Sequence, residues 1–345
     1  MKVLIVGDVH WSEYASIVRK RGPKYSKRLE NLINSVNWVE ATAEEYNCDM
    51  IIFLGDFFDK SELNAAEVTA LQEVVWARIP HIYLVGNHEE MLQDLSTSSA
   101  HFFNSIPYAK VIDEPTFEEL PGGMFVYIPY ILEEERKPLI EYIPDTIANT
   151  FVFSHNDIKG INFGHFESKE GFEVSEIEEH CDRFFNGHLH NGTQFCKNGF
   201  NIGNLTGQNF SEDASKYEHK VCVFETEDYQ QLWLENPYAL NFYKFEINDI
   251  NTYLRKIKDI KNNSVVTIKV PEASVADIKK LIAENDKIIE YRIICVPNKV
   301  DSNNQKENVV IESVNHLDQF VQYIKDNLEM TDIIVSELSE VCKCN

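Results

Sequence analysis

The sequence predicts an α/β fold with parallel strands, and three observations support this prediction. First, short uninterrupted apolar runs recur between residues 3 and 185, each bounded by glycine or polar residues, as in strands that are buried on both faces. Second, apolar residues at helical spacing lie between some of these runs, and alternating strands and helices are typical of α/β layer folds. Third, each run ends in a polar cluster, at the end of the strand where parallel sheets bind ligands.

Five apolar runs are expected to form buried strands. They are Val3–Val6, Met50–Leu54, Ile82–Val85, Phe151–Phe153 and Phe184–Phe185. The polar clusters that follow them are Gly7–His10, Gly55–Asp59, Gly86–Glu89, Ser154–Asn156 and Asn186–His190. Because the carboxyl ends of parallel strands meet at one edge of a sheet, we expect the five clusters to lie close together.

Two helices are expected between the first three strands. Residues 29–43 carry apolar side chains at clear helical spacing, and residues 71–75 do so less cleanly. After the last glycine, Gly207, the pattern is simpler: a strand at 265–270, a helix at 275–282 and a strand at 288–296 predict a small βαβ-type module. A polar linker follows, and then two amphipathic helices at 314–328 and 333–341.

These patterns divide the chain into four parts. We expect a large domain at 1–240, the small module at 241–300, the linker at 301–311 and a helical segment at 312–345.

Composition excludes several classes of protein. The chain has 345 residues, of which 43% are hydrophobic and 26% charged, as in globular proteins and unlike disordered ones. No run reaches the ~18 apolar residues of a membrane span, and the N-terminus lacks the pattern of a signal peptide. The seven cysteines show no CxxC spacing, which favours reduced thiols. We therefore expect a cytoplasmic protein that does not associate with membranes, in the host-cell cytosol if the gene belongs to a phage.

The polar clusters together offer the donor atoms of a two-metal site. Their candidate ligands are Asp8, His10, Asp56, Asn87, His155, His188 and His190. Seven oxygen and nitrogen donors are too many for one tetrahedral ion, but they suit two ions that share a carboxylate, and the imidazole–carboxylate mixture favours Mn²⁺, Fe²⁺ or Zn²⁺. Two such ions clamp the attacking and leaving oxygens of a displacement at phosphorus and lower the pKa of bound water. The remaining histidines, such as His81, His101 and His219, lack this context and are expected to be ordinary.

The ordered set of motifs over residues 1–210 resembles the calcineurin-like metallophosphoesterase signature. The motifs are Asp8-x-His10, Gly55-Asp56-x-x-Asp59, Gly86-Asn87-His88-Glu89, His155 and Gly187-His188-x-His190. The resemblance implies a four-layer α/β/β/α sandwich with a dinuclear metal centre. It places Asp8, His10, Asp56 and His190 on one ion and Asp56, Asn87, His155 and His188 on the other, with Asp56 bridging. His88 would stabilise the transition state or protonate the leaving oxygen, a role that suits the pKa range of histidine.

Within this family, the chain is most similar to SbcD/Mre-eleven-type DNA repair nuclease subunits, including their phage counterparts. Protein Ser/Thr phosphatases carry arginine directly after the Asp59 position, whereas this chain has Lys60. Some family members have histidine at the Asp59 position, so its role here stays open. The nuclease resemblance implies that 241–300 is an α+β capping module and that 312–345 binds an SbcC-like, SMC-type coiled-coil ATPase. It also implies a homodimer.

The expected function is therefore a DNA nuclease, endonuclease and/or 3′–5′ exonuclease, that uses two divalent ions, with Mn²⁺ favoured, in recombination and double-strand-break repair. Two alternatives remain open: a stand-alone phosphoesterase acting on a nucleotide or small phosphodiester, and a non-catalytic scaffold for the ATPase.

One basic segment is a candidate DNA contact. The net charge of −24 excludes binding to nucleic acid by bulk charge, so any contact needs a local patch. Six cations lie within ten residues: Arg19, Lys20, Arg21, Lys24, Lys27 and Arg28. The aromatic residues Trp11, Tyr14 and Tyr25 nearby are candidates for stacking on bases. The alternative is that this segment is a solvated loop and helix start.

Overall fold

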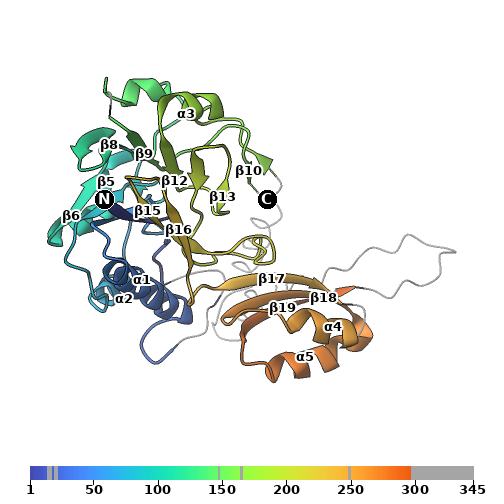
Figure 1. Cartoon of the computed structure of the whole chain (residues 1–345). Helices are drawn as coiled ribbons and strands as arrows, with labels where there is room; N and C mark the ends of the chain where they lie inside the picture. The colour runs from blue at the N-terminus through green and yellow to red at the C-terminus, as the bar shows by residue number, and fades with distance from the viewer. Residues whose placement is uncertain (14–17, 19–21, 147, 164–165, 248–249, 297–345) are drawn as a thin grey trace, which may run out of the picture. The chain divides into compact units, whose positions relative to one another are not determined.

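A computed structural model describes residues 1–13, 18, 22–146, 148–163, 166–247 and 250–296 (Figure 1). Two six-stranded sheets and a three-stranded sheet hold most of the strands in these residues. The predicted linker at 301–311 and the helical segment at 312–345 lie outside the described residues, so both stay predictions.

The first six-stranded sheet contains the first three predicted strands. Its order is β16 (Gln231–Glu235), β15 (Lys220–Glu225), β1 (Lys2–Val6), β2 (Met50–Phe53), β3 (His81–Leu84) and β6 (Ala109–Ile112). The strands β1, β2, β3 and β6 are parallel, and β15 and β16 are antiparallel to their neighbours. Asp8, Asp56 and Asn87 therefore leave the sheet at the same edge.

The second six-stranded sheet contains the other two predicted strands. Its order is β13 (Thr193–Gln194), β14 (Gly199–Asn201), β12 (Arg183–Asn186), β9 (Thr150–Ser154), β8 (Gly123–Ile128) and β7 (Thr116–Leu120). The four central strands are parallel, and the two edge strands are antiparallel to them. His155 follows β9, and His188 and His190 follow β12.

The two sheets pack face to face, with helices on their outer faces. The core between them joins Ile5 and Ile52 of the first sheet to Phe151 and Phe185 of the second. A second core packs the outer face of the first sheet against α1 (Lys27–Glu45), α2 (Ala65–Leu71) and the 3₁₀ turn η1 (Ser99–Ser105). A third core packs the second sheet against α3 (Val174–His180) and η2 (Leu139–Tyr142). This is the four-layer α/β/β/α arrangement that the resemblance implied.

Helix α1 forms where the sequence predicted a helix. Ser26 caps its first turn by accepting a hydrogen bond from the backbone N–H of Leu29 at 3.1 Å. The apolar stripe from Leu29 to Ala43 is buried against the first sheet. The helix expected at 71–75 is wrong in position. Helix α2 ends at Leu71, and Val75 lies beyond it, 77% exposed.

The small module has its own sheet and core. Its strands β17 (Asn241–Glu246), β18 (Ser264–Pro271) and β19 (Ile288–Val296) are parallel, and α4 (Ile250–Ile257) and α5 (Val275–Ala283) connect them. Val266, Ile268, Ile278 and Ile282 form part of its core. The predicted strand–helix–strand order is confirmed, while β17 and α4 were not predicted.

The remaining described elements are short. They are the strand pairs β4 (Glu90–Met91) with β5 (Asp94–Ser98) and β10 (Asn162–Phe163) with β11 (Phe166–Glu167), and the 3₁₀ turn η3 (Glu272–Ser274). Within the described residues, no helix combines the length and apolar character that crossing a bilayer requires.

Candidate metal centre

The seven predicted ligands lie together, at the carboxyl ends of strands from both six-stranded sheets. Among the described residues, their His and Asp members, with His88, form three groups: Asp8, His10 and His190; His10, Asp56 and His88; and Asp56, His155 and His188. Within each group, the candidate ligand atoms lie within 4.8 Å of one another. The five strand ends thus converge as the sequence predicted.

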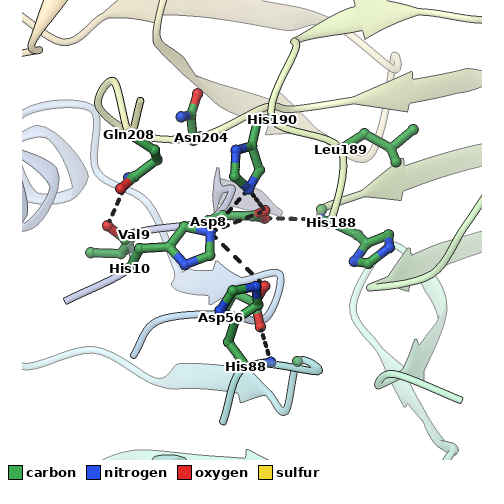
Figure 2. Close-up of polar contacts among 12 residues, drawn as sticks. Asp8, Val9, His10, Asp56, His88, His188, Leu189, His190, Asn204 and Gln208 are labelled. Carbon is green, nitrogen blue, oxygen red and sulfur yellow. Dashed lines mark hydrogen bonds and ion pairs between the residues drawn. The ribbon is translucent and has the colours of Figure 1, made fainter. Parts of the chain in front are cut away.

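The first subsite consists of Asp8, His10 and His190 (Figure 2). Nε2 of His10 lies 3.1 Å from Nε2 of His190, and Oδ2 of Asp8 lies 3.9 and 3.8 Å from these two atoms. Oδ1 of Asp8 accepts a hydrogen bond from the backbone N–H of His188 at 3.0 Å. Oδ2 is buried and has no hydrogen-bond donor in the described part of the chain. A buried carboxylate oxygen without a donor is costly, and a cation between it and the two imidazoles would stabilise it.

The second subsite consists of Asp56, Asn87, His155 and His188. Nε2 of His155 lies 3.3 Å from Oδ2 of Asp56 and 3.2 Å from Oδ1 of Asn87. Nδ1 of His188 lies 3.0 Å from the same Asn87 oxygen. Because Oδ2 of Asp56 is also 4.0 Å from Nε2 of His10, this carboxylate lies between the two subsites, where a bridging ligand belongs.

Two of the imidazole rings contact groups that are not among the seven predicted ligands. Nδ1 of His155 lies 2.6 Å from the carbonyl oxygen of Leu54, and Nδ1 of His10 lies 3.2 Å from Oδ1 of Asp59. The carbonyl of Leu54 can only accept a hydrogen bond, so Nδ1 of His155 carries a proton and its Nε2 is the nitrogen that faces the centre. Beside His10, Asp59 places a carboxylate next to Nδ1, while Nε2 faces Asp8 and His190.

Three of the seven predicted ligands have a backbone conformation that residues with side chains rarely adopt. They are Asp56 (φ 48°), His10 (φ 51°) and His188 (φ 67°). A non-glycine residue at positive φ costs about 1–3 kcal/mol and persists where surrounding contacts over-determine it. Such strain is common at functional sites, and here it is found at three residues whose side chains face the candidate centre.

Two motif glycines allow the loops to approach closely. A Cβ at Gly86 would lie 2.2 Å from Oδ1 of Asp56, and a Cβ at Gly55 would lie 2.3 Å from Nδ1 of His155. Gly55 also has φ +94°, which glycine adopts without strain. Both glycines are therefore required by the packing of the ligands themselves.

The electrostatics of the site favour cation binding. Burial alone would raise the pKa of Asp56, but the charges of His155 and His10 outweigh it and lower the pKa. Burial lowers the pKa of His155, yet its contact with Asp56 raises it to about 9. Burial, together with the neighbouring His10, lowers the pKa of His190 to about 4. Buried ionised carboxylates beside imidazoles, with no thiolate, are a donor set that fits divalent transition-metal ions.

Comparison with known families agrees with this geometry. The calcineurin-like phosphoesterase family matches residues 1–192, more than half of the chain. The chain belongs to this family. The predicted resemblance to the calcineurin-like family is confirmed.

Individual relatives are distant. The "Exonuclease subunit 1" of Enterobacteria phage T4 is 24% identical over 197 residues, which is 55% of each chain. This chain thus spans about half the length of that curated relative. Among solved structures, a dimetal phosphatase from Danio rerio (11% identity, TM-score 0.41) covers 68% of this chain and 99% of its own. A hypothetical protein from Thermus thermophilus (12% identity, TM-score 0.38) covers 69% of this chain and 100% of its own.

In this member of the family, His88 lies at the rim of the candidate centre. Its backbone N–H donates to Oδ1 of Asp56 at 2.9 Å, and its Nδ1 lies 3.1 Å from the backbone carbonyl of Asp59. The ring packs edge-on against His10 at 4.8 Å, and the side chain is 42% exposed. His88 is thus the accessible histidine next to the bridging carboxylate, although its ring is also close enough to be an alternative ligand.

Glu89, which was not among the predicted site residues, joins two loops that carry predicted ligands. This buried carboxylate accepts hydrogen bonds from the backbone N–H groups of Gly86 (2.8 Å) and Phe58 (3.0 Å). Burial, and then the charge of Asp56, raise the pKa of Glu89 to about 8. The available signal was its place in the Gly86–Glu89 cluster, where an acidic residue follows the histidine.

Three buried asparagines that connect loops of the candidate site were also not predicted: Asn156, Asn186 and Asn201. Asn186 donates to the backbone carbonyl of Asn156 at 2.8 Å, and the backbone N–H of Asn156 donates back to Oδ1 of Asn186 at 3.2 Å. Asn186 also contacts Oδ1 of Asn201 at 3.3 Å. This network ties the loop of His155 to that of His188. A buried asparagine that directly ends an apolar run was the available signal.

The basic segment differs from the expected surface patch. Arg28 is buried, and its Nη2 donates to the carbonyl oxygen of His10 at 3.2 Å and to the side chain of Gln208, so it supports the first subsite from behind. Its assignment as a surface DNA contact is therefore corrected. Lys24 and Lys27 are exposed and pair with Glu73 and Glu30, whereas Arg19, Lys20 and Arg21 lie outside the described residues.

The stacking role expected for two aromatic residues is also wrong. Trp11 is buried and donates from Nε1 to the carbonyl oxygen of Glu67 at 3.1 Å. Tyr25 is 3% exposed and donates from its hydroxyl to Glu73 at 2.8 Å. Tyr14 lies outside the described residues.

Three of the histidines that were not predicted as ligands contact groups outside the candidate metal centre. His81 is buried against Glu40 at 2.9 Å, and His101 lies 3.4 Å from Asp113. His219 is buried, with Nδ1 3.0 Å from the carbonyl oxygen of Asn204. Burial lowers the pKa of His219 to about 4.

The buried His219 should make folding sensitive to acid. In the unfolded chain a histidine has a pKa of about 6.5, so between about pH 6.5 and 4 the unfolded state binds more protons and stability falls as the pH falls. In His219→Gln this contribution is absent. The stability advantage of the wild type should shrink on acidification by up to about 1.4 kcal/mol per pH unit. Urea unfolding in chelator across this window measures it; parallel curves for the two proteins would show that His219 does not titrate on unfolding.

Proposed function

We propose that this calcineurin-like phosphoesterase is a dinuclear-metal DNA nuclease subunit, with Mn²⁺ as its favoured ion. The observation that carries the proposal is the convergence of all seven candidate ligands, with Asp56 between the two subsites and the exposed His88 at the rim. A degenerate, non-catalytic scaffold would be expected to lose some of these donors. The relative from phage T4, named as an exonuclease subunit, supports a nucleic acid as the class of substrate.

Each group of site residues has its own role in the proposed reaction. Two divalent ions, when bound, would lower the pKa of water and neutralise charge on the phosphodiester. Asp8, His10 and His190 would hold the first ion; Asn87, His155 and His188 would hold the second; Asp56 would bridge them. With its Nδ1 held at the carbonyl of Asp59, His88 can present Nε2 to the phosphate and protonate the leaving oxygen.

The residue after Asp59 supports a diester substrate rather than a protein phosphate. The resemblance places a phosphate-gripping arginine here in protein phosphatases, whereas this chain has Lys60, whose Nζ lies 3.9 Å from the buried carboxylate of Glu67. A lysine that already pairs with a carboxylate binds the non-bridging oxygens of a phosphate monoester less strongly.

The partners of the nuclease are part of the same proposal. The T4 relative is named as a subunit, which supports a multi-subunit assembly. We place an SbcC-like coiled-coil ATPase at the segment 312–345 and propose a homodimer that carries the module 241–300 as a cap. A cytoplasmic role in recombination and double-strand-break repair follows from this assignment.

The decisive experiment compares two substrates. The protein, freed of metal and reloaded with Mn²⁺, should cleave linear and hairpin DNA and also hydrolyse a small chromogenic phosphodiester. Hydrolysis of the small diester alone would favour a stand-alone phosphoesterase. No turnover of either substrate despite two bound ions would favour the scaffold.

The first three cations of the basic segment offer a separate test. If Arg19, Lys20 and Arg21 contact phosphates, their joint reversal to glutamate should weaken DNA binding on all sequences. It should also flatten the log–log salt dependence by about 0.9 per lost duplex contact. Affinity would be measured against salt in Ca²⁺ to limit cleavage. Lys24→Glu is the matched control, because Lys24 already pairs with Glu73. An unchanged slope in the triple variant would assign the segment to a solvated surface.

A further inference from the structure

A carboxylate outside the proposed ligand set contacts the second subsite. Oδ2 of Asp157 lies 3.5 Å from Nε2 of His188. On the other side of the same ring, Nδ1 of His188 lies 3.0 Å from Oδ1 of Asn87. The two ring nitrogens therefore face different partners, one toward the metal subsite and the other toward Asp157.

Asp157 is itself held in place by the segment that follows it. The hydroxyl of Ser168, a buried residue, lies 3.2 Å from Oδ1 of Asp157 and shares its proton with the carbonyl of Glu170 at 3.0 Å. The backbone N–H of Phe172 donates to the carbonyl oxygen of Asp157 at 3.0 Å. At Gly171 (φ +107°), a Cβ would lie 2.1 Å from that oxygen, so the close packing depends on glycine. Asp157 is thus built into a fixed position.

We propose that Asp157 is a positioning residue for the second metal subsite. By accepting the Nε2–H of His188, it fixes the tautomer whose Nδ1 lone pair faces Asn87 in the second subsite. A carboxylate behind a ligating histidine also increases the basicity of the donor nitrogen. The inference rests on the dinuclear centre proposed above.

Charge balance supports this role. The seven proposed ligands include two carboxylates, Asp8 and Asp56, so two divalent ions would leave two positive charges uncompensated. Asp59 behind His10 and Asp157 behind His188 place one further carboxylate next to each subsite. Such compensation matters because the site is buried and poorly screened by solvent.

The test is the binding of Mn²⁺ itself, measured by calorimetry and electron paramagnetic resonance. Wild type should bind two ions and show the signal of an exchange-coupled pair. In Asp157→Asn we expect one of the two binding steps to weaken about 10–100-fold, the usual effect of losing such a partner, while the other stays unchanged. At equal loading, the six-line signal of isolated Mn²⁺ should then replace the coupled signal. Ser168→Ala should cause a smaller loss at the same step.

The control is Asp182→Asn, which removes the same charge near the opposite ends of β9 and β12, where Asp182 accepts the backbone N–H of Thr150 at 2.8 Å. It should leave both binding steps unchanged. Two unchanged steps in Asp157→Asn would overturn the inference. So would equal weakening of both steps together with a lower melting temperature in chelator, because that pattern indicates a structural role. A wild type that binds fewer than two ions would instead overturn the dinuclear centre.

Discussion

Replacement of Asp56 by asparagine is expected to remove most of the activity and to release bound metal. Oδ2 of Asp56 lies 3.3 Å from Nε2 of His155 and 4.0 Å from Nε2 of His10, so one charged oxygen serves both subsites. A neutral amide cannot hold two cations at close range. If the ions supply several kcal/mol of transition-state stabilisation, their loss lowers turnover about 10³-fold or more. Calorimetry with Mn²⁺ and hydrolysis of a small phosphodiester measure the two effects.

A matched control exists at the other end of the same strand. Asp49 precedes β2 at its opposite end and accepts the backbone N–H of Lys2 at 2.8 Å. Asp49→Asn makes the same chemical change away from the centre and should keep both metal and activity. Two ions bound at unchanged affinity in Asp56→Asn would show that Asp56 does not bridge them.

His88→Gln is expected to separate chemistry from metal binding. His88 is at the rim and 42% exposed, and its backbone N–H, which contacts Asp56, is unaffected by the substitution. Loss of a positioned general acid lowers turnover about 10²–10⁴-fold. Metal content, measured by elemental analysis, should stay at two ions per chain, and DNA affinity in Ca²⁺ should also persist.

His101→Gln is the control for this experiment. His101 lies on the 3₁₀ turn η1, pairs with Asp113 and belongs to none of the candidate metal-binding groups of the described residues. It should retain full activity. If His88→Gln instead loses an ion, His88 is a ligand, as its closeness to His10 and Asp56 would allow. Near-full activity would remove His88 from the mechanism.

The fold was predictable where the pattern is local. The run Val3–Val6 is apolar throughout, residues 29–43 repeat apolar side chains at helical spacing, and both elements formed as expected. Strands such as β7 and β16 escaped detection because they lie at sheet edges and alternate buried with exposed residues weakly. The helix predicted at 71–75 was misplaced because Asn64 caps a helix that starts earlier and ends at Leu71.

The site was predictable as a list of donors but not as a geometry. Asp8, Asp56 and the candidate histidine ligands each lie within four residues of the end of a strand, and the sequence shows this closeness to an apolar run. Arg28 was misread as a surface cation, because a basic residue in a basic run carries no sign that its guanidinium turns inward to the carbonyl of His10. Burial of this kind depends on residues far away in the chain, here Gln208.

By itself, then, the sequence determined the α/β class, the order of the strand-end motifs and the chemical types of the seven candidate ligands, because apolar runs and the residues after them are recognised within a few positions. The tertiary structure alone decided which imidazole nitrogen faces the centre and which groups lie behind it. His155 is oriented by Leu54, 101 positions away, and Asp8 receives the backbone N–H of His188 across 180 positions. Contacts over such separations arise only when two sheets pack face to face, and no local pattern of residues records them.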